Sequence, residues 1–277
     1  DDFTRIVHEA GGLCFYDQAN ANGIMGIARA KEAGFDACHF NLHKTFSSPH
    51  GCEGPAAGAY GCTEKLAPYL PIPVVTKTGE RYHLDYNRPK SVGKIRSFYG
   101  NLECILKAYA WIRSMGPEGL KTAAEISVLN NQYLEHLLMQ IDGVTHPYAE
   151  GKPRFEQIRY SLEKLKENTG FGSHEIQNRM VDFGIQSYWL SHHPFVVPEP
   201  FTPEPCESYS KEDIEYWAGV IEQACKEARE TPEVIRTAPH NQSVHQIRDF
   251  NQAEDADRWA TTWRAYQKKK KKCTERE

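Results

Sequence analysis

The sequence predicts an α/β fold that is followed by a smaller α+β domain. Two apolar, strand-like runs support the α/β part: residues 12–16 end at Asp17, and residues 37–42 lead into Lys44. In doubly wound sheets the groups that contact a ligand stand at the carboxyl ends of the strands. We therefore expect Asp17 and Lys44 to lie near one edge of a sheet.

Short elements complete residues 1–99. Residues 24–32 are expected to form a helix and residues 64–69 a helical turn. Residues 71–75 and 82–86 flank a Thr-Gly pair, which predicts a β-hairpin. We interpret this region as the carboxyl-terminal part of a large α/β domain.

Two helices are expected to link the domains over residues 100–140. Residues 100–114 carry apolar side chains on several sides, which predicts a largely buried helix. Residues 118–139 carry leucines that cluster toward one face, which predicts a second helix with one side buried.

Residues 141–277 are assigned to the small carboxyl-terminal domain. Ser210 and Asp213 form a capping-box pattern at the start of a helix that runs to about Glu230. The apolar residues expected on its inner face are Ile214, Trp217, Ala218, Ile221 and Cys225. The other expected elements are strands at 154–162 and 186–191 and a helix at 173–183.

Composition bounds the classes of function. The 277 residues are 40% hydrophobic and 25% charged, as in an ordinary soluble protein. A net charge of −4 creates no basic field for nucleic acid or an anionic membrane. No apolar run approaches the roughly 20 residues that a membrane span needs. The eight cysteines include no C-x-x-C pair, so incidental thiols explain them better than a metal or redox motif.

The pairing of Asp17 with Lys44 suggests pyridoxal phosphate. A lysine amine can form a Schiff base with an aldehyde cofactor, and a carboxylate beside the pyridine nitrogen makes the ring an electron sink. Ala19 is small enough to pack flat against the ring, Asn20 could reach its phenolic oxygen, and His43 could position the lysine or relay a proton. A simpler interpretation is that Asp17 caps a turn and Lys44 is a solvated surface residue.

The segment around Lys44 carries a family resemblance. The residues Gly34-Phe35-Asp36, His39-Phe40-Asn41-Leu42-His43-Lys44-Thr45-Phe46, Pro49-His50-Gly51, Gly54-Pro55 and Gly58 resemble the P-protein of the glycine cleavage system. More narrowly, they look like the second subunit of its two-chain bacterial form. Weaker similarity continues through Leu70-Pro71-Ile72-Pro73, 113–120 and 204–208 to Ala238-Pro239-His240.

This resemblance implies a fold-type I pyridoxal-phosphate enzyme. Lys44 matches the family's Schiff-base lysine, Asp17 the partner of the pyridine nitrogen and Ala19 the ring-packing residue. The implied function is the decarboxylation of glycine, with transfer of the aminomethyl group to the lipoyl arm of the H-protein. The first P-protein subunit is the implied partner in a cytoplasmic hetero-oligomer. Because no phosphate-binding turn precedes Asp17, we expect the chain to be amino-terminally incomplete.

The chain also departs from the family pattern. Cys52 and Glu53 interrupt the glycine-rich loop expected over 49–61, and Cys206 stands where the family usually has threonine. Two alternatives therefore stay open. One is an enzyme of the same fold that acts on another amino acid, and the other is a non-catalytic scaffolding subunit.

Three remaining features have simple explanations. His192 and His193 on a strand would point to opposite faces, so a role at a pocket rim is preferred over a shared metal with His240 or His245. The aromatic stripe of Trp259, Trp263 and Tyr266 is expected to dock the tail onto its own domain, and the lysines at 268–272 to be solvated.

Overall fold

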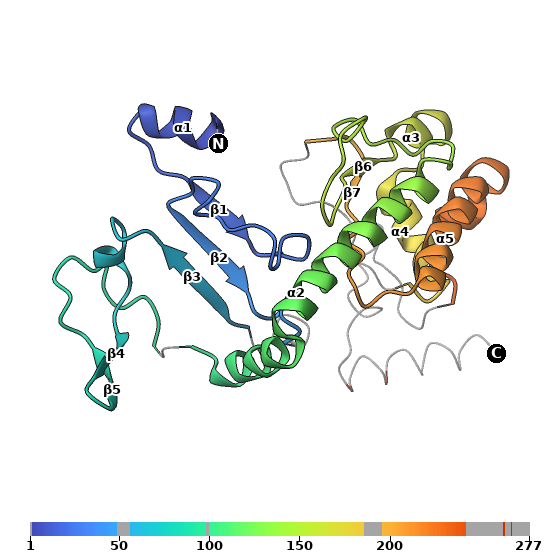
Figure 1. Ribbon diagram of the computed structural model, residues 1–277. Coiled ribbons are helices and arrows are strands. Elements are labelled where there is room, and N and C mark those ends of the chain that lie inside the picture. The colour runs from blue at the N-terminus through green and yellow to red at the C-terminus, as the bar shows by residue number, and fades with distance from the viewer. Residues whose placement is uncertain are drawn as a thin grey trace.

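A computed structural model describes residues 2–48, 56–97, 100–185 and 196–241, together with Trp263 and Gln267. The described elements are α1 (Asp2–Glu9), β1 (Phe15–Gln18), β2 (Ala37–Asn41), β3 (Gly58–Cys62), the 3-10 helix η1 (Ala67–Tyr69), β4 (Val74–Thr78), β5 (Arg81–Asp85), α2 (Leu102–Leu138), β6 (Tyr160–Ser161), α3 (Glu163–Thr169), α4 (Ser173–Val181), β7 (Pro200–Phe201), α5 (Lys211–Glu230) and α6 (Pro232–Thr237). Figure 1 shows α2 running between the β1–β3 sheet and the helices of the second half.

The sheet that carries the predicted site has the strand order β1-β2-β3. β1 and β2 are parallel, with Asp17 opposite His39. β1 begins at Phe15 and includes Asp17, so the predicted strand at 12–16 was placed too early. β3 pairs antiparallel with β2, which corrects the expectation of a loop over its residues. Gly58 suits this position, because a Cβ there would lie 3.1 Å from the Phe40 carbonyl oxygen.

Residues 24–32 do not form the predicted helix. The chain makes successive turns there, and the Ala28 N–H donates to the Ile24 carbonyl at 3.1 Å before the helical path ends. Gly26 has φ +69, and a Cβ on it would lie 3.3 Å from Lys121 Cβ. The apolar pattern therefore reflects packing against α2, because Ile24 and Met25 share a core with Ala123 and Ala124.

The hairpin and the short helical turn are confirmed. β4 and β5 pair antiparallel, and Gly79 takes φ 60 in the turn between them. The helical turn is shorter than predicted, because only the 3-10 helix η1 forms, with Pro68 in its first turn.

The two linking helices are confirmed as the two halves of α2. They meet at a kink where Gly116 has φ 64 and ψ −179, followed by Pro117. The first half was expected to be largely buried, and that expectation is wrong for this chain. Leu102 is 64% exposed and Tyr109 60%, and only the small side chains of Cys104 and Ala108 are buried there.

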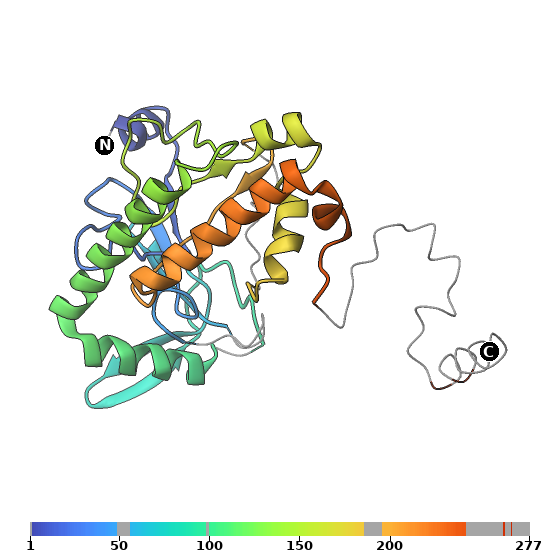
Figure 2. The same cartoon turned by 90° about the vertical axis from the view of Figure 1, so that its right-hand side faces the viewer.

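The second half of the chain has its own core, which begins on α2 at Leu134 and ends at Ile235. α5 packs against α2 and α4 in this core (Figure 2). The predicted capping box is confirmed, because Asp213 N–H donates to Ser210 Oγ at 3.1 Å and Asp213 Oδ2 accepts from Ser210 N–H at 3.0 Å. The expected apolar residues of α5 lie in or against the core.

The other predictions for the second half are met in part. The helix at 173–183 is confirmed as α4. The strand at 154–162 is only the two residues of β6, which pair with β7. The strand predicted at 186–191 lies outside the described residues, as do His192, His193 and His245. Of the aromatic stripe only Trp263 is described, and it is 71% exposed. Among the described helices, none is both long enough and apolar enough to span a bilayer.

Candidate functional site

A tight turn directly after β2 holds Lys44. The Lys44 N–H donates to the Asn41 carbonyl at 3.2 Å, and the Ser48 N–H donates to the Leu42 carbonyl at 3.2 Å. Ser47 has φ 57, a left-handed conformation that costs energy outside glycine and asparagine. Lys44 itself is exposed, while the side chains of Thr45 and Ser48 in the same turn are buried. The turn therefore leaves the Lys44 side chain exposed and buries the side chains of Thr45 and Ser48.

Asp17 stands near the end of β1, on the strand adjacent to the one that carries Lys44. Its Oδ1 accepts a hydrogen bond from the Ala19 N–H at 2.9 Å and lies 3.5 Å from His39 Nε2. The side chain is 69% exposed. The turn-capping interpretation of Asp17 is therefore correct in this structure. Capping uses Oδ1, and a carboxylate has a second oxygen that can also accept, so capping and ligand binding are compatible.

The ring of His43 is held by the far end of the loop that follows Lys44. His43 Nδ1 lies 3.1 Å from the Ala57 carbonyl oxygen and 3.3 Å from the Ala57 nitrogen. These backbone contacts fix the imidazole plane beside the lysine. Residues 49–55, which include Cys52 and Glu53, lie outside the described residues.

Asn20 contacts a residue that the sequence did not suggest as part of the site. Its Nδ2 donates a short hydrogen bond to Glu204 Oε2, and Asn22 Nδ2 donates to Glu204 Oε1 at 3.2 Å. Glu204 follows β7, so the contact joins the second half of the chain to the loop after Asp17. The only sequence signal was the position of Glu204 between two prolines in a segment of family resemblance.

Glu156 is a second acid that meets the same loop. Burial raises the pKa of the Glu156 carboxyl, while a hydrogen bond from the Gly23 backbone opposes the rise. A Cβ on Gly23 would lie 2.5 Å from Glu156 Oε2, so glycine permits this close approach. Burial, and then the negative charge of Glu156, raise the pKa of Glu204 to about 7, and the amide of Asn20 and the positive charge of Lys44 oppose that rise.

Three polar atoms around the site are buried without a hydrogen-bond partner in the described part of the chain. They are Gln18 Oε1, Asn20 Oδ1 and Ser48 Oγ. Gln18 and Asn20 flank the loop after Asp17, and Ser48 closes the Lys44 turn. Buried polar groups are nearly always satisfied in native proteins, so each of these unpaired atoms indicates a missing polar partner. The residues present fit a polar ligand.

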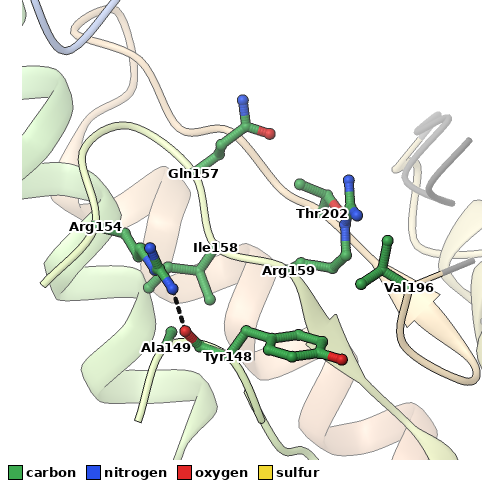
Figure 3. Close-up of a pocket in the computed structure, with 8 residues that line it drawn as sticks. All are labelled: Tyr148, Ala149, Arg154, Gln157, Ile158, Arg159, Val196 and Thr202. Atoms are coloured by element: carbon green, nitrogen blue, oxygen red, sulfur yellow. Dashed lines mark hydrogen bonds between the residues drawn. The ribbon is translucent and has the colours of Figure 1, made fainter. Parts of the chain in front are cut away.

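A surface hollow lies on the second half of the chain, beside the segments that carry the two acids. Its lining residues are Tyr148, Ala149, Arg154, Gln157, Ile158, Arg159, Val196 and Thr202, and its volume is about 290 Å³ (Figure 3). Arg154 donates to the Tyr148 carbonyl oxygen across it. None of the predicted site residues lines this hollow, so it is not the predicted cofactor site.

The histidine metal hypothesis gains no support from the described residues. His240 contacts Asp182 and Thr237 instead, with Nδ1 3.2 Å from Asp182 Oδ2 and Nε2 2.8 Å from Thr237 Oγ1. A separate cluster of His8, Cys14 and Asp36 was not predicted. Asp36 there accepts a hydrogen bond from the Cys14 N–H at 2.8 Å and lies 2.7 Å from His8 Nε2. These two contacts explain why the three residues lie close together.

Comparison with known sequences supports the family resemblance. No protein-family model matches the chain. A probable glycine dehydrogenase (decarboxylating) subunit 2 of Pyrococcus horikoshii is 39% identical over 274 residues, which are 98% of this chain and 53% of that protein. The protein of the same name from Caldanaerobacter subterraneus is 42% identical over 247 residues, 89% of this chain and 50% of that protein. The chain spans about half the length of the curated relatives it matches, and they confirm the resemblance.

Comparison with solved structures confirms the fold. A glycine decarboxylase (P-protein) of the glycine cleavage system, in inhibitor-bound form, matches with a TM-score of 0.64 at 19% identity, over 80% of this chain and 50% of that one. A cysteine desulfurase from Thermococcus onnurineus matches with a TM-score of 0.58 at 17% identity, over 81% of this chain and 55% of that one. The chain therefore has the fold-type I architecture that the resemblance implied.

Proposed function

We propose that this chain, a homologue of glycine dehydrogenase (decarboxylating) subunit 2, carries the lysine-bearing half of a pyridoxal-phosphate-dependent glycine decarboxylase. The observation that carries the proposal is the placement of Asp17 and Lys44 at the carboxyl ends of two adjacent parallel strands, β1 and β2. Neither a scaffold nor a simple binding module needs an acid and an amine at that edge.

Each predicted residue receives a role in this proposal. Lys44 would hold the cofactor aldehyde, Asp17 would pair with the pyridine nitrogen, and Ala19 would pack against the ring. Asn20 would contact the phenolic oxygen, and His43, whose ring contacts Ala57, would handle protons beside the amine. The bound cofactor supplies an electron sink for the carbanion that remains when CO2 leaves glycine.

The overall reaction balances with one further reactant. Glycine loses its carboxylate as CO2, and the remaining aminomethyl carbon forms a bond to one sulfur of the lipoyl disulfide on the H-protein. That disulfide is broken and its second sulfur leaves as a thiol, so the two electrons from the lost carboxylate reduce it. We propose the H-protein as the acceptor, the first subunit as the partner in a hetero-oligomer, and the cytoplasm as the location.

Covalent trapping tests the proposal. The chain, alone and together with the first subunit of a relative, is incubated with pyridoxal phosphate, reduced with borohydride and mapped by mass spectrometry. A pyridoxyl group on Lys44, absent in Lys44→Ala and kept when the exposed Lys31 is changed to Ala, is the expected result. Modification spread over surface lysines with none at Lys44, in the presence of the partner subunit and with the amino-terminal region of a relative joined to the chain, would overturn it.

Glycine specificity needs a second assay. The complex that traps the cofactor on Lys44 is expected to exchange labelled bicarbonate into the glycine carboxyl group only when lipoylated H-protein is added. Exchange into another amino acid, with none into glycine, would favour a different substrate on the same fold.

A further inference from the structure

The β4–β5 hairpin leaves one apolar face uncovered. Val75 pairs with Leu84 and Lys77 pairs with Tyr82, so these four side chains lie on the same face of the ribbon. All four are exposed, and Tyr82 is 71% exposed. Within the described part of the chain, the two strands pack against each other and against no other helix or strand to a comparable extent. Figure 1 shows the hairpin beyond β3, at the opposite end of the molecule from α5. A hairpin by itself is marginally stable, so this face needs a cover.

The segment after the hairpin exposes more apolar side chains. Val92 and Ile95 are each 67% exposed. Two backbone hydrogen bonds hold this segment in place, from the Val92 N–H to the Tyr69 carbonyl at 3.1 Å and from the Ile72 N–H to the Gly93 carbonyl at 3.2 Å. Because the segment is already ordered, a docking partner would pay little conformational entropy to bind it. The hairpin surface is defined here as the exposed apolar residues Val75, Tyr82, Leu84, Tyr86, Val92 and Ile95.

Residues 74–97 are basic in an acidic chain. They contain six basic and two acidic residues, a net charge of +4, whereas the whole chain has −4. The two acids are already paired, Glu80 with Lys77 at 3.5 Å and Asp85 with Arg88 at 3.3 Å. The remaining basic residues are exposed and form no ion pair with any residue that the structure describes. They are Arg81, Lys90, Lys94 and Arg96. Unpaired positive charge is therefore interleaved with the apolar residues of the hairpin surface.

A second apolar stripe follows directly in the chain. Leu102, Leu106 and Tyr109 on the first half of α2 are exposed, and their spacing of four and three residues places them on one face of the helix. Two successive elements thus leave apolar side chains in solvent. Exposed apolar surface of this extent is typical of protein–protein interaction sites.

We propose that the hairpin surface docks the first subunit of the two-chain enzyme, through a face of that subunit that is apolar at its centre and acidic at its rim. The apolar residues need an apolar partner, and tyrosine and arginine are enriched at protein interfaces. The unpaired basic residues need acidic groups opposite them. The identity of the partner rests on the proposed function, whereas the location of the surface rests on the hairpin itself.

Charge argues against two other occupants. The carboxyl-terminal tail, residues 242–277, contains nine basic and six acidic residues, so its net charge of +3 does not complement a basic surface. A nucleic acid would meet a net charge of −8 on the rest of the chain outside residues 74–97, which repels a polyanion.

Binding of the first subunit tests the surface directly. The dissociation constant of the chain for the first subunit of a relative is measured by interferometry, with the relative's own second subunit as the positive reference. We expect Tyr82→Ala and Leu84→Ser each to weaken binding by about tenfold or more, as at an interface hot spot. The matched variant Tyr148→Ala, which removes a tyrosine that is 57% exposed on the second half of the chain, should leave binding unchanged. Equal affinities of the wild type and both hairpin variants, or no binding of the wild type, would overturn the proposal.

The basic residues provide a second arm of the test. Reversal of two exposed charges in Lys90→Glu with Lys94→Glu should slow association by about tenfold at low salt and weaken its dependence on salt. The same reversal at the exposed Lys31 should do neither. An unchanged rate and an unchanged salt dependence in the double variant would exclude an acidic rim on the partner.

Footprinting of the wild type covers the case in which the hairpin variants do not fold. Hydroxyl-radical oxidation of Tyr82 and Tyr86 should fall when the first subunit is added. It should not fall when lipoylated H-protein is added instead, or when the chain is concentrated by itself. Protection in either of those two samples, with none from the first subunit, would assign the surface to the H-protein or to a second copy and overturn the proposal.

Cofactor trapping separates this inference from the proposed function. If the hairpin variants lose the first subunit while the wild-type complex, with the amino-terminal region of a relative joined to the chain, carries no pyridoxyl group on Lys44, the proposed function fails and the docking surface stands. If Lys44 is modified in that complex while the hairpin variants bind the first subunit normally, the docking surface fails and the proposed function stands.

Discussion

Thr45 Oγ1 accepts a hydrogen bond from the backbone N–H of Ala21 at 2.8 Å, inside the protein. Thr45 follows Lys44, and Ala21 lies in the loop that begins at Asp17, so this one bond ties together the two segments that carry the candidate site. The Thr45 side chain is 6% exposed and Ala21 is 1% exposed. Among the described residues, no other hydrogen bond between these two segments involves a sequence neighbour of Lys44.

Removing the Thr45 hydroxyl should loosen the site. Thr45→Val keeps the side-chain shape but leaves the Ala21 N–H buried without its acceptor, which costs about 1–3 kcal/mol. Urea unfolding of the chain should show a loss of that size in the free energy of unfolding. The same change at the exposed Thr78 of the β4–β5 hairpin should stay within about 0.5 kcal/mol. Equal effects at the two positions would mean that the Thr45 bond does not form.

A glycine at the kink of α2 offers a second stability test. Gly116 has φ 64 and ψ −179, a conformation open essentially to glycine alone, although a Cβ there would meet no atom within 4 Å. Gly116→Ala should therefore destabilise the chain by about 1–3 kcal/mol through backbone strain alone.

Gly219 provides the matched control for this substitution. It lies inside α5, and a Cβ there would also meet no atom within 4 Å. Gly219→Ala should stabilise the chain by about 0.5–1 kcal/mol, because alanine favours a helix over glycine. Thermal unfolding should show shifts of opposite sign for the two variants, and shifts of the same sign would contradict the kinked geometry of α2.

Asp182 makes the stability of the second half depend on pH. Burial alone would raise its pKa, but hydrogen bonds from the Asn241 N–H, the Arg179 guanidinium and the His240 N–H together lower it. A carboxyl whose pKa is lowered by folding contributes stability above its unfolded pKa of roughly 4, and this contribution is lost as the pH falls through the folded pKa.

The substitution Asp182→Asn isolates this contribution. The Asp182 side chain is 1% exposed and lies 2.8 Å from Arg179 Nη1, so the loss of its charge should cost about 1–3 kcal/mol at pH 7. The difference between variant and wild type should begin to shrink as the pH falls below about 4, and it should vanish only below the lowered pKa of folded Asp182, where both carry no charge at this position. Glu222→Gln on exposed α5 surface should show no such dependence. A pH-independent difference for Asp182→Asn would exclude the ionised pair as its source.

Local patterns in the sequence predicted much of the fold because they encode local physics. The Ser210–Asp213 capping box and the apolar face of α5 were both found, since each depends on residues within a few positions. The prediction of a helix at 24–32 was wrong because successive turns that pack apolar side chains against α2 give the same apolar spacing as a helix. Gly26, which takes φ +69, was the one residue of this segment that could have indicated turns.

Contacts between distant segments were beyond sequence reasoning. The apolar pattern of the first half of α2 identified an apolar helix but not what would cover it, and Leu106 is 56% exposed. In the candidate site, Asp17 and Lys44 were predicted from their chemistry and from the resemblance. Glu204 was not, because its contact with Asn20 depends on how the second half of the chain packs against the first.

The thiols should differ sharply in reactivity. Burial raises the pKa of the Cys225 thiol to about 12, and the side chain is 0% exposed in the core of α5. Cys206 is half-buried on the segment after Glu204, with its sulfur 3.0 Å from Ser208 Oγ. Because the thiolate is the reactive form, iodoacetamide at pH 8 should modify Cys206 while Cys225 stays intact, as read by peptide mapping. Both should react once the chain is unfolded in guanidinium. Early modification of Cys225 in the native chain would mean that α5 does not bury its inner face.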